Sequence, residues 1–291
     1  MGVLKTLAYY PGCALHSSSR EYDLSTREVA KILGISLQEI PGWVCCGASP
    51  LHQTEEVLSV ALPLYNLSLA KKKVTPQVVV CCAACFNRLK TSLYRVEREE
   101  ILRKEIEGII QEETPRISVK HFLEILREPE VSERISSLLV RELRELRVVC
   151  YYGCLLVRPP EVMNFDDPEN PQILDHLMTR LGATVIDWPF KVDCCGANLS
   201  LILKEEIHRL VGRIIKGAID TGADCIVVAC PLCQANLDLK QGEIEELKDI
   251  GIPVLYFTQL LGLSLGIPER RLGLNRHRID PRRMLKELGL L

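Results

Sequence analysis

The sequence has no stretch that could cross a membrane as a helix. The longest apolar candidate, residues 254–267, contains polar residues and is shorter than the roughly 18 to 20 apolar residues that a spanning helix needs. The first residues, MGVLKTLAYYPG, carry no basic region followed by a long apolar run, so we expect no secretory signal. We therefore expect a soluble, cytoplasmic protein in a reducing compartment.

An excess of charge of one sign is also absent. The sequence has 36 Lys and Arg against 38 Asp and Glu, and its formal net charge is −2. Because both signs are mixed along the chain, nucleic acid and anionic membrane surfaces are not indicated as partners. No G-x-G-x-x-G turn follows a strand, so the sequence offers no flavin or nucleotide site of its own.

Cysteine, by contrast, is abundant, with 13 residues in a chain of 291. A chain of this length can form two domains with hydrophobic cores, so neither needs disulfides in order to fold. In a reducing compartment, dense cysteine is typical of metal or redox chemistry.

The cysteines recur in two copies of one pattern. AYYPGC, VCCGAS and VVVCCAAC in the first half match CYYGC, DCCGAN and IVVACPLC in the second, in the same order. Cys154 lies 141 positions after Cys13, whereas the later elements are separated by 149 and 148 positions. The pattern indicates a tandem duplication with a short insertion at residues 158–171 and two domains, residues 1–145 and 146–291.

The regions around the cysteines have the character of an α/β fold. QVVVCC and DCIVVAC read as buried strands that enter a turn. Helical patterns lie between such runs, and we expect helices at residues 23–33, 54–70, 95–113, 171–181 and 199–218. This alternation predicts a small parallel sheet flanked by helices in each half. Sites in such sheets form at the carboxyl ends of the strands, so the cysteines should converge there.

Five cysteines of each half take equivalent places, and three kinds of chemistry could use them. Structural zinc takes four ligands in a tetrahedron, which fits five cysteines with an adjacent pair poorly. A site with several irons can use both neighbours. A disulfide between adjacent cysteines would strain the peptide and leave the other three thiols unexplained. An iron–sulfur site is favoured, while zinc in one half and disulfide chemistry without metal remain alternatives.

The other cysteines, Cys81, Cys150 and Cys225, lie within apolar strands and are interpreted as small buried hydrophobic residues. The glycine after each adjacent pair, and Gly12 and Gly153 before the first cysteine of each half, would let the backbone turn tightly and approach a cluster.

The motifs YYPGC, CCGAS, CAACFNRL, YYGCLLVRPPEV, DCCGAN and ACPLCQANLDL resemble the tandem cysteine-rich CCG domain and, over essentially the whole chain, the heterodisulfide reductase B-subunit family. The resemblance implies two noncubane [4Fe-4S] clusters. Their ligands would be Cys13, Cys45, Cys46, Cys82 and Cys85 in the first half, and Cys154, Cys194, Cys195, Cys230 and Cys233 in the second. Around the first-half cysteines the chain looks more like bacterial and non-methanogen versions than methanogen ones, so the disulfide is not identified.

The resemblance further implies an oxidoreductase acting on sulfur groups, which reduces a disulfide between the clusters or runs the reverse thiol oxidation. Its partners would be the ferredoxin-like C subunit of the complex together with its flavin-containing A subunit. The alternative is a CCG electron-transfer or anchoring component of a dehydrogenase complex, with no substrate of its own. Five polar residues near the cysteines are candidate contacts for an anionic thiol compound, although an ordinary place on the polar rim is the simpler interpretation: His16, Arg20, His52, Arg158 and Lys191.

Overall fold

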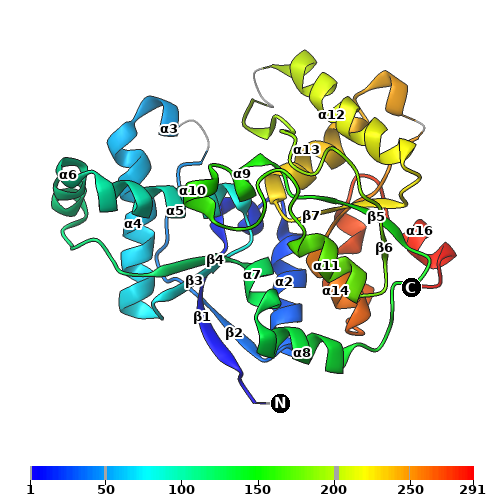
Figure 1. Cartoon of the computed structure of the whole chain (residues 1–291), viewed down its shortest axis with the longest axis horizontal. Helices are drawn as coiled ribbons and strands as arrows, with labels where there is room; N and C mark the ends of the chain where they lie inside the picture. The colour runs from blue at the N-terminus through cyan, green and yellow to red at the C-terminus, as the bar shows by residue number, and fades with distance from the viewer. Residues whose placement is uncertain (1, 49–50, 200–202, 249) are drawn as a thin grey trace.

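Two parallel sheets of four strands form the centre of the molecule (Figure 1). The computed structural model describes residues 2–48, 51–199, 203–248 and 250–291, without the side chains of residues 52, 53 and 198. The first sheet has the order β2-β1-β3-β4 and the second the order β6-β5-β7-β8. The strands are β1 (Lys5–Tyr10), β2 (Ile35–Glu39), β3 (Gln77–Val80), β4 (Ser118–His121), β5 (Arg147–Tyr151), β6 (Thr184–Val185), β7 (Cys225–Val228) and β8 (Val254–Tyr256). The equal strand orders confirm the predicted α/β fold with two pseudo-symmetric halves.

The central strands are buried on both faces, which explains why they read as continuous apolar runs. Val78, Val79 and Val80 of β3 are fully buried, as is the whole of β7. In the first sheet Tyr10 pairs with Val80 and Val80 with His121, so these strands end at one edge. The cysteine turns follow directly at this edge, and the second sheet repeats the arrangement.

Helices cover both sheets. In the first half they are α1 (Gly12–His16), α2 (Arg20–Ile32), α3 (Leu51–Thr54), α4 (Glu56–Lys73), α5 (Ala83–Arg98), α6 (Glu100–Ile110), α7 (Phe122–Arg127) and α8 (Pro129–Leu138). In the second half they are α9 (Cys154–Val157), α10 (Pro160–Met163), α11 (Ile173–Arg180), α12 (Lys204–Asp220), α13 (Pro231–Gln241), α14 (Phe257–Ser264), α15 (Glu269–Leu272) and α16 (Arg282–Glu287).

The single helix predicted at residues 95–113 is wrong, because two helices meet at Glu99. Its backbone leaves the helical region, with φ −109° and ψ 88°. Arg95 at the end of α5 pairs with Glu99 and with Glu56 of α4, at 2.8 and 2.7 Å. The bend lets the apolar side of α6, with Leu102 and Ile106, pack toward α4.

The two halves interlock through their helices. In Figure 1 the blue α2 lies beside the orange α14, and α2 packs against both α14 and α15. Tyr22 of α2 stacks on Tyr256 with ring centroids 4.0 Å apart. The first residue of the predicted insertion and the segment before it contact the first half, since the side-chain amide of Asn87 donates to the carbonyls of Arg158 and Leu155 at 2.8 and 3.3 Å. Along the sequence, the strands of the first sheet come before residues 139–146 and those of the second sheet come after them. The domain boundary after residue 145 stays a prediction.

Candidate metal centre

The cysteine turns of both halves sit at the carboxyl ends of the central strands. Cys82 and Cys230 immediately precede α5 and α13, and each has the extended backbone of a residue that precedes a helix. Cys154 opens α9 after β5, and Cys13 lies in α1 after β1. The topology therefore brings the cysteines together as the sequence predicts.

In the second half, all five candidate ligands line one cavity of about 280 Å³. Cys195 and Cys233 are buried, and their sulfurs lie 3.7 Å apart. The rest of the lining is mainly apolar and includes Leu155, Leu199 and Leu232. Ala83 of the first half also lines the cavity, so the second-half site opens onto the first half.

In the first half, the Cys46 and Cys85 sulfurs lie 3.3 Å apart. The pKa of Cys82 is raised most by the neighbouring Cys230, which belongs to the other half. The two sets of thiols thus adjoin across the boundary between the halves. In the described parts of the chain, no three or more His, Cys, Asp or Glu side chains are gathered as a site for a single metal ion.

Two glycines allow the closest backbone approach to the sulfurs. Gly12 and Gly153 have φ values of +71° and +70°, a region that L-residues with a side chain rarely adopt. A Cβ at Gly12 would lie 2.9 Å from the Cys85 sulfur, and one at Gly153 would lie 2.9 Å from the Cys233 sulfur. The space beside these sulfurs therefore exists only because both positions lack a side chain.

Backbone N–H groups donate to the first cysteine of each adjacent pair. Gly47 N lies 3.4 Å from the Cys45 sulfur, and Gly196 N lies 3.3 Å from the Cys194 sulfur. The neighbouring Cys154 thiol and then this N–H lower the pKa of Cys194 to about 6, against the effect of burial. The neighbouring Cys13 and Cys46 thiols likewise lower the pKa of Cys45. Each half thus holds at least one thiol whose pKa is lowered, since the pKa of Cys230 is also below its usual value, and thiolates are the form of cysteine that binds metals.

Exposure divides each set into a floor and a rim. The buried cysteines are Cys46, Cys82, Cys85, Cys195, Cys230 and Cys233. Cys13, Cys45 and Cys194 are exposed, and Cys154 is half-buried. Each set therefore has both buried and solvent-exposed members.

Cys81, Cys150 and Cys225 are fully buried, which confirms their interpretation as small hydrophobic residues. Burial raises the pKa of Cys81 to about 12, and Cys81 contacts the Thr26 hydroxyl at 3.6 Å. They remain neutral thiols within the core.

The candidate substrate contacts occupy different environments. His16 is exposed and lies 3.1 Å from the Glu39 carboxylate. Arg20 is exposed, and its Nε donates to the His16 carbonyl at 3.2 Å. Arg158 pairs with Glu169 at 2.7 Å. The side chain of His52 lies outside the described part of the structure.

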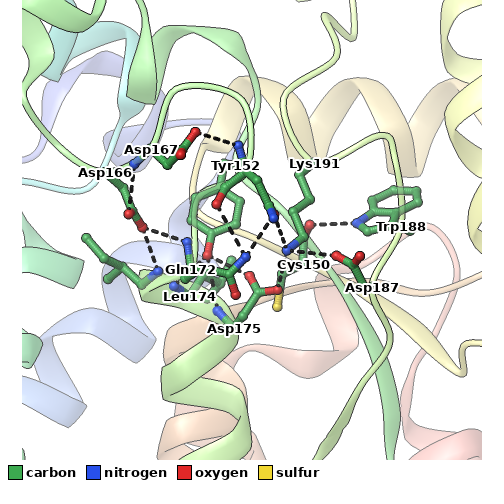
Figure 2. A network of polar contacts seen from close by, with 12 residues as sticks. Cys150, Tyr152, Asp166, Asp167, Gln172, Leu174, Asp175, Asp187, Trp188 and Lys191 are labelled. Atoms are coloured by element: carbon green, nitrogen blue, oxygen red, sulfur yellow. Dashed lines mark hydrogen bonds and ion pairs between the residues drawn. The ribbon is translucent and has the colours of Figure 1, made fainter.

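Lys191 differs from the other candidates because its side chain is buried. Its Nζ lies 2.8 Å from Asp175 and 3.2 Å from Asp187 (Figure 2). The Lys191 carbonyl accepts hydrogen bonds from Tyr152 N and Gly153 N at 2.8 and 3.1 Å. Its ammonium is thus already paired, and its backbone supports the turn before Cys154 rather than a substrate.

Tyr152 and Asp175 complete this buried network and were not expected from the sequence. The Tyr152 hydroxyl donates to Asp175 at 2.6 Å and accepts from Leu174 N at 2.8 Å (Figure 2). Tyr152 also lines the cavity. The sequence offered one indication of a local difference: Tyr152 occupies the position, two residues before the first cysteine, that Pro11 occupies in the first half.

His121 was also missed, and it joins the two halves. The ring is fully buried at the end of β4, and its Nδ1 accepts from Leu123 N at 3.3 Å. Nε2 therefore carries the proton and lies 3.0 Å from the Cys81 carbonyl and 3.2 Å from the Ala229 carbonyl. These carbonyls immediately precede Cys82 and Cys230. Burial lowers the pKa of His121 to about 4, so it stays neutral.

Comparison with known proteins gives one family for both halves. The cysteine-rich domain CCG matches residues 7–90 and 148–238. The 8-methylmenaquinol:fumarate reductase membrane anchor subunit of Wolinella succinogenes is 32% identical and aligns over 95% of this chain and 98% of its own. The B subunit of the ferredoxin:CoB-CoM heterodisulfide reductase of Methanosarcina mazei is 26% identical and aligns over 95% of both chains.

A hypothetical protein from Helicobacter pylori has a similar solved fold, with a TM-score of 0.76 at 15% identity. The match covers 94% of this chain and 52% of that one, so the chain spans about half the length of that protein. Among the helices in the described ranges, none is both long enough and apolar enough to cross a membrane.

Proposed function

The chain belongs to the family of cysteine-rich CCG domain proteins that includes the B subunit of heterodisulfide reductase, and from this premise we propose that it is the catalytic component of a heterodisulfide reductase-like complex. The named relatives are subunits of oxidoreductase complexes, so a general redox role is common to them. The proposed reaction is the two-electron cleavage of a disulfide, R–S–S–R′ with two electrons and two protons yielding two thiols, or its reverse.

The observation that carries this proposal is the meeting of the two thiol sets across the halves. Cys82 and Cys230 are neighbours, and the second-half cavity is lined partly by Ala83 of the first half. A disulfide has two sulfurs, and two adjoining sites could receive one each. A single site would leave the second sulfur unsupported after transfer of the first electron.

The residues present fit a noncubane [4Fe-4S] cluster in each half. Each set offers five thiols, soft ligands that iron–sulfur clusters use. Gly12 and Gly153 keep space open beside Cys85 and Cys233 that a Cβ would fill. The holding residues would be Cys13, Cys45, Cys46, Cys82 and Cys85 in one half and Cys154, Cys194, Cys195, Cys230 and Cys233 in the other. When bound, such clusters supply electrons one at a time.

The chain's own groups would prepare and enclose the reaction. The neighbouring thiols and, to a lesser extent, the N–H groups of Gly47 and Gly196 favour the thiolate forms of Cys45 and Cys194. Leu155 and Leu232 give the second-half cavity an apolar wall, which limits water around the sulfurs. The exposed rim cysteines leave an entrance for a small disulfide.

Electrons must come from other proteins, because the sequence shows no nucleotide or flavin motif. We assign this supply to two partner proteins, a ferredoxin-like C subunit with a flavin-containing A subunit. One relative is named as part of a ferredoxin-linked heterodisulfide reductase, which supports a donor of this kind.

A second function is that of an electron-transfer or anchoring component with no substrate of its own. The 32% identical relative, named as a membrane anchor subunit, favours it. In that case iron–sulfur sites in the two halves would pass electrons between partner proteins. Zinc in one half is the alternative to iron, and that half would then carry no electrons.

Metal analysis and disulfide cleavage by anaerobically purified protein distinguish these functions. The disulfide reductase should contain about eight irons per chain and cleave a disulfide from a panel with reduced viologen. The panel would hold CoM-S-S-CoB, glutathione disulfide and cystine. Cys154→Ser should lose iron and activity, whereas Cys225→Ser, outside the site, should keep both. Iron without cleavage, even with the partner proteins present, would support the conduit, and zinc without iron would refute both.

A further inference from the structure

The two sites differ in charge at equivalent positions of the duplicated fold. Three residues after the last cysteine of each set, the first half has Arg88 in α5 and the second half has Asn236 in α13. The neutral Asn236 amide donates to the Cys195 carbonyl. Arg88 brings a positive charge to the matching place.

Arg88 is half-buried and its charge is not cancelled by a carboxylate. Its guanidinium donates to the Asn87 side-chain oxygen at 3.0 Å, and no ion pair involves it among the residues that the structure describes. It lines a cavity of about 370 Å³ together with Glu56 and Arg95, and the Glu56 carboxylate is paired with Arg95 rather than with Arg88. Burial lowers the pKa of Arg88, and the neighbouring Cys46 opposes this effect. Arg88 thus lies close enough to Cys46 for the two groups to interact.

A second difference lies directly before the adjacent cysteines. The first half has Val44 there and the second half has Asp193. Asp193 places a carboxylate directly before Cys194, one of the exposed cysteines of the second set. Asp193 pairs with Arg213, whose side chain is 54% exposed, so solvent screens this partner. Asp193 thus has one exposed cationic partner, whereas Arg95 is paired with two carboxylates and Arg88 with none among the described residues.

Other charges near the second site do not reverse this difference. The buried Lys191 ammonium faces two carboxylates, Asp175 and Asp187. Cys13 is exposed whereas its counterpart Cys154 is half-buried, so the first site is also better solvated.

We propose that the first-half cluster is the more easily reduced of the two, and that Arg88 and Asp193 set this order. The inference rests on the proposed presence of a cluster in each half. Reduction adds one negative charge, taken from an external one-electron donor. A nearby cation and better solvation favour the charged product, and a nearby carboxylate disfavours it. Electrons arriving singly would therefore occupy the first half before the second.

A redox titration followed by electron paramagnetic resonance tests this order on the whole iron-loaded chain. Cys13→Ser and Cys154→Ser each alter the signal of one half and so assign the signals. Arg88→Met should lower the equilibrium constant for reducing the first-half cluster by roughly tenfold, or about 59 mV for one electron. Arg88→Lys keeps the positive charge and should keep most of the first-half potential that Arg88→Met loses. Asp193→Asn removes a carboxylate and should raise the potential of the second-half cluster.

Arg95→Met is the matched control, because Arg95 lines the same cavity but is paired with Glu56 and Glu99. It should move neither signal appreciably. A second-half cluster that is reduced first, or an iron-replete Arg88→Met protein whose first-half potential is unchanged, would overturn the inference alone. A chain that binds no iron would overturn the proposed function and the inference together.

Discussion

Replacing Lys191 by Met should destabilise the second half selectively, because it breaks a buried ion pair. Lys191 and Asp175 have side chains that are 4% and 7% exposed, and their charged atoms lie 2.8 Å apart. Removing one partner leaves the other charge buried, which typically costs about 3 to 5 kcal/mol. For a chain of this size that corresponds to a fall in melting temperature on the order of 10 °C.

The damage should extend to the metal site, since the network supports the turn that carries Cys154. The Asp175 carboxylate accepts the Tyr152 hydroxyl at 2.6 Å, and the Lys191 carbonyl accepts from Gly153 N at 3.1 Å. If Asp175 draws in water, we expect Tyr152 to shift and the second half to lose iron before the first. Thermal unfolding followed by circular dichroism and iron analysis would measure both effects.

Two companion variants make this prediction refutable. Lys191→Met with Asp175→Asn removes both charges while keeping an acceptor for the Tyr152 hydroxyl, so it should recover a large part of the loss. Arg158→Met breaks a pair whose side chains are 40% and 76% exposed, and should cost less than about 1 kcal/mol. A Lys191→Met protein as stable as Arg158→Met, or a double variant no more stable than the single one, would refute the role of the buried pair.

Three further predictions concern groups around the cysteines. Because His121 is buried and neutral with a pKa near 4, against about 6.5 when unfolded, the unfolded state binds more protons between these values. His121 should therefore contribute a fall in stability of about 3 kcal/mol from pH 6.5 to 4, in addition to that of the buried His277, whose pKa is also lowered to about 4; urea unfolding of His121→Gln should show a smaller total fall, and an equal fall would contradict this role. Gly153→Ala would place a Cβ 2.9 Å from the Cys233 sulfur and should lower the iron content of the second half. Gly42→Ala, whose Cβ would lie in open space, should keep it. Equal iron content in the two variants would contradict the need for open space beside Cys233. Cys150→Ala should cost on the order of 1 kcal/mol in unfolding and leave iron unchanged, and iron loss would assign Cys150 to the site.

Local patterns explain how much of this structure the sequence could predict. β3 and β7 are short buried runs that lead directly to Cys82 and Cys230, so the strands and the meeting of the cysteines were both visible. The break at Glu99 was not, because an amphipathic pattern continues across it and only packing of α6 toward α4 requires the bend.

Contacts between distant residues account for the rest. His121 binds carbonyls 40 and 108 positions away, and no spacing rule connects such residues. Lys191 appeared as a polar rim residue because its nearness to Cys194 was visible while its burial was not. Its buried ion-pair partner, Asp175, lies on α11, which begins after the insertion.

The two halves are alike in their cysteines and differ in the residues just behind them. The proposed ligand cysteines and the glycines that approach them, Gly12 and Gly153, recur in both halves. The residues just behind them have diverged: Pro11 corresponds to Tyr152, Cys81 to Ala229 and Arg88 to Asn236. These positions can change the charge and support of one site without altering its donors. A repeated set of proposed ligands within unlike surroundings would give the two halves different electrostatic environments for the same donors.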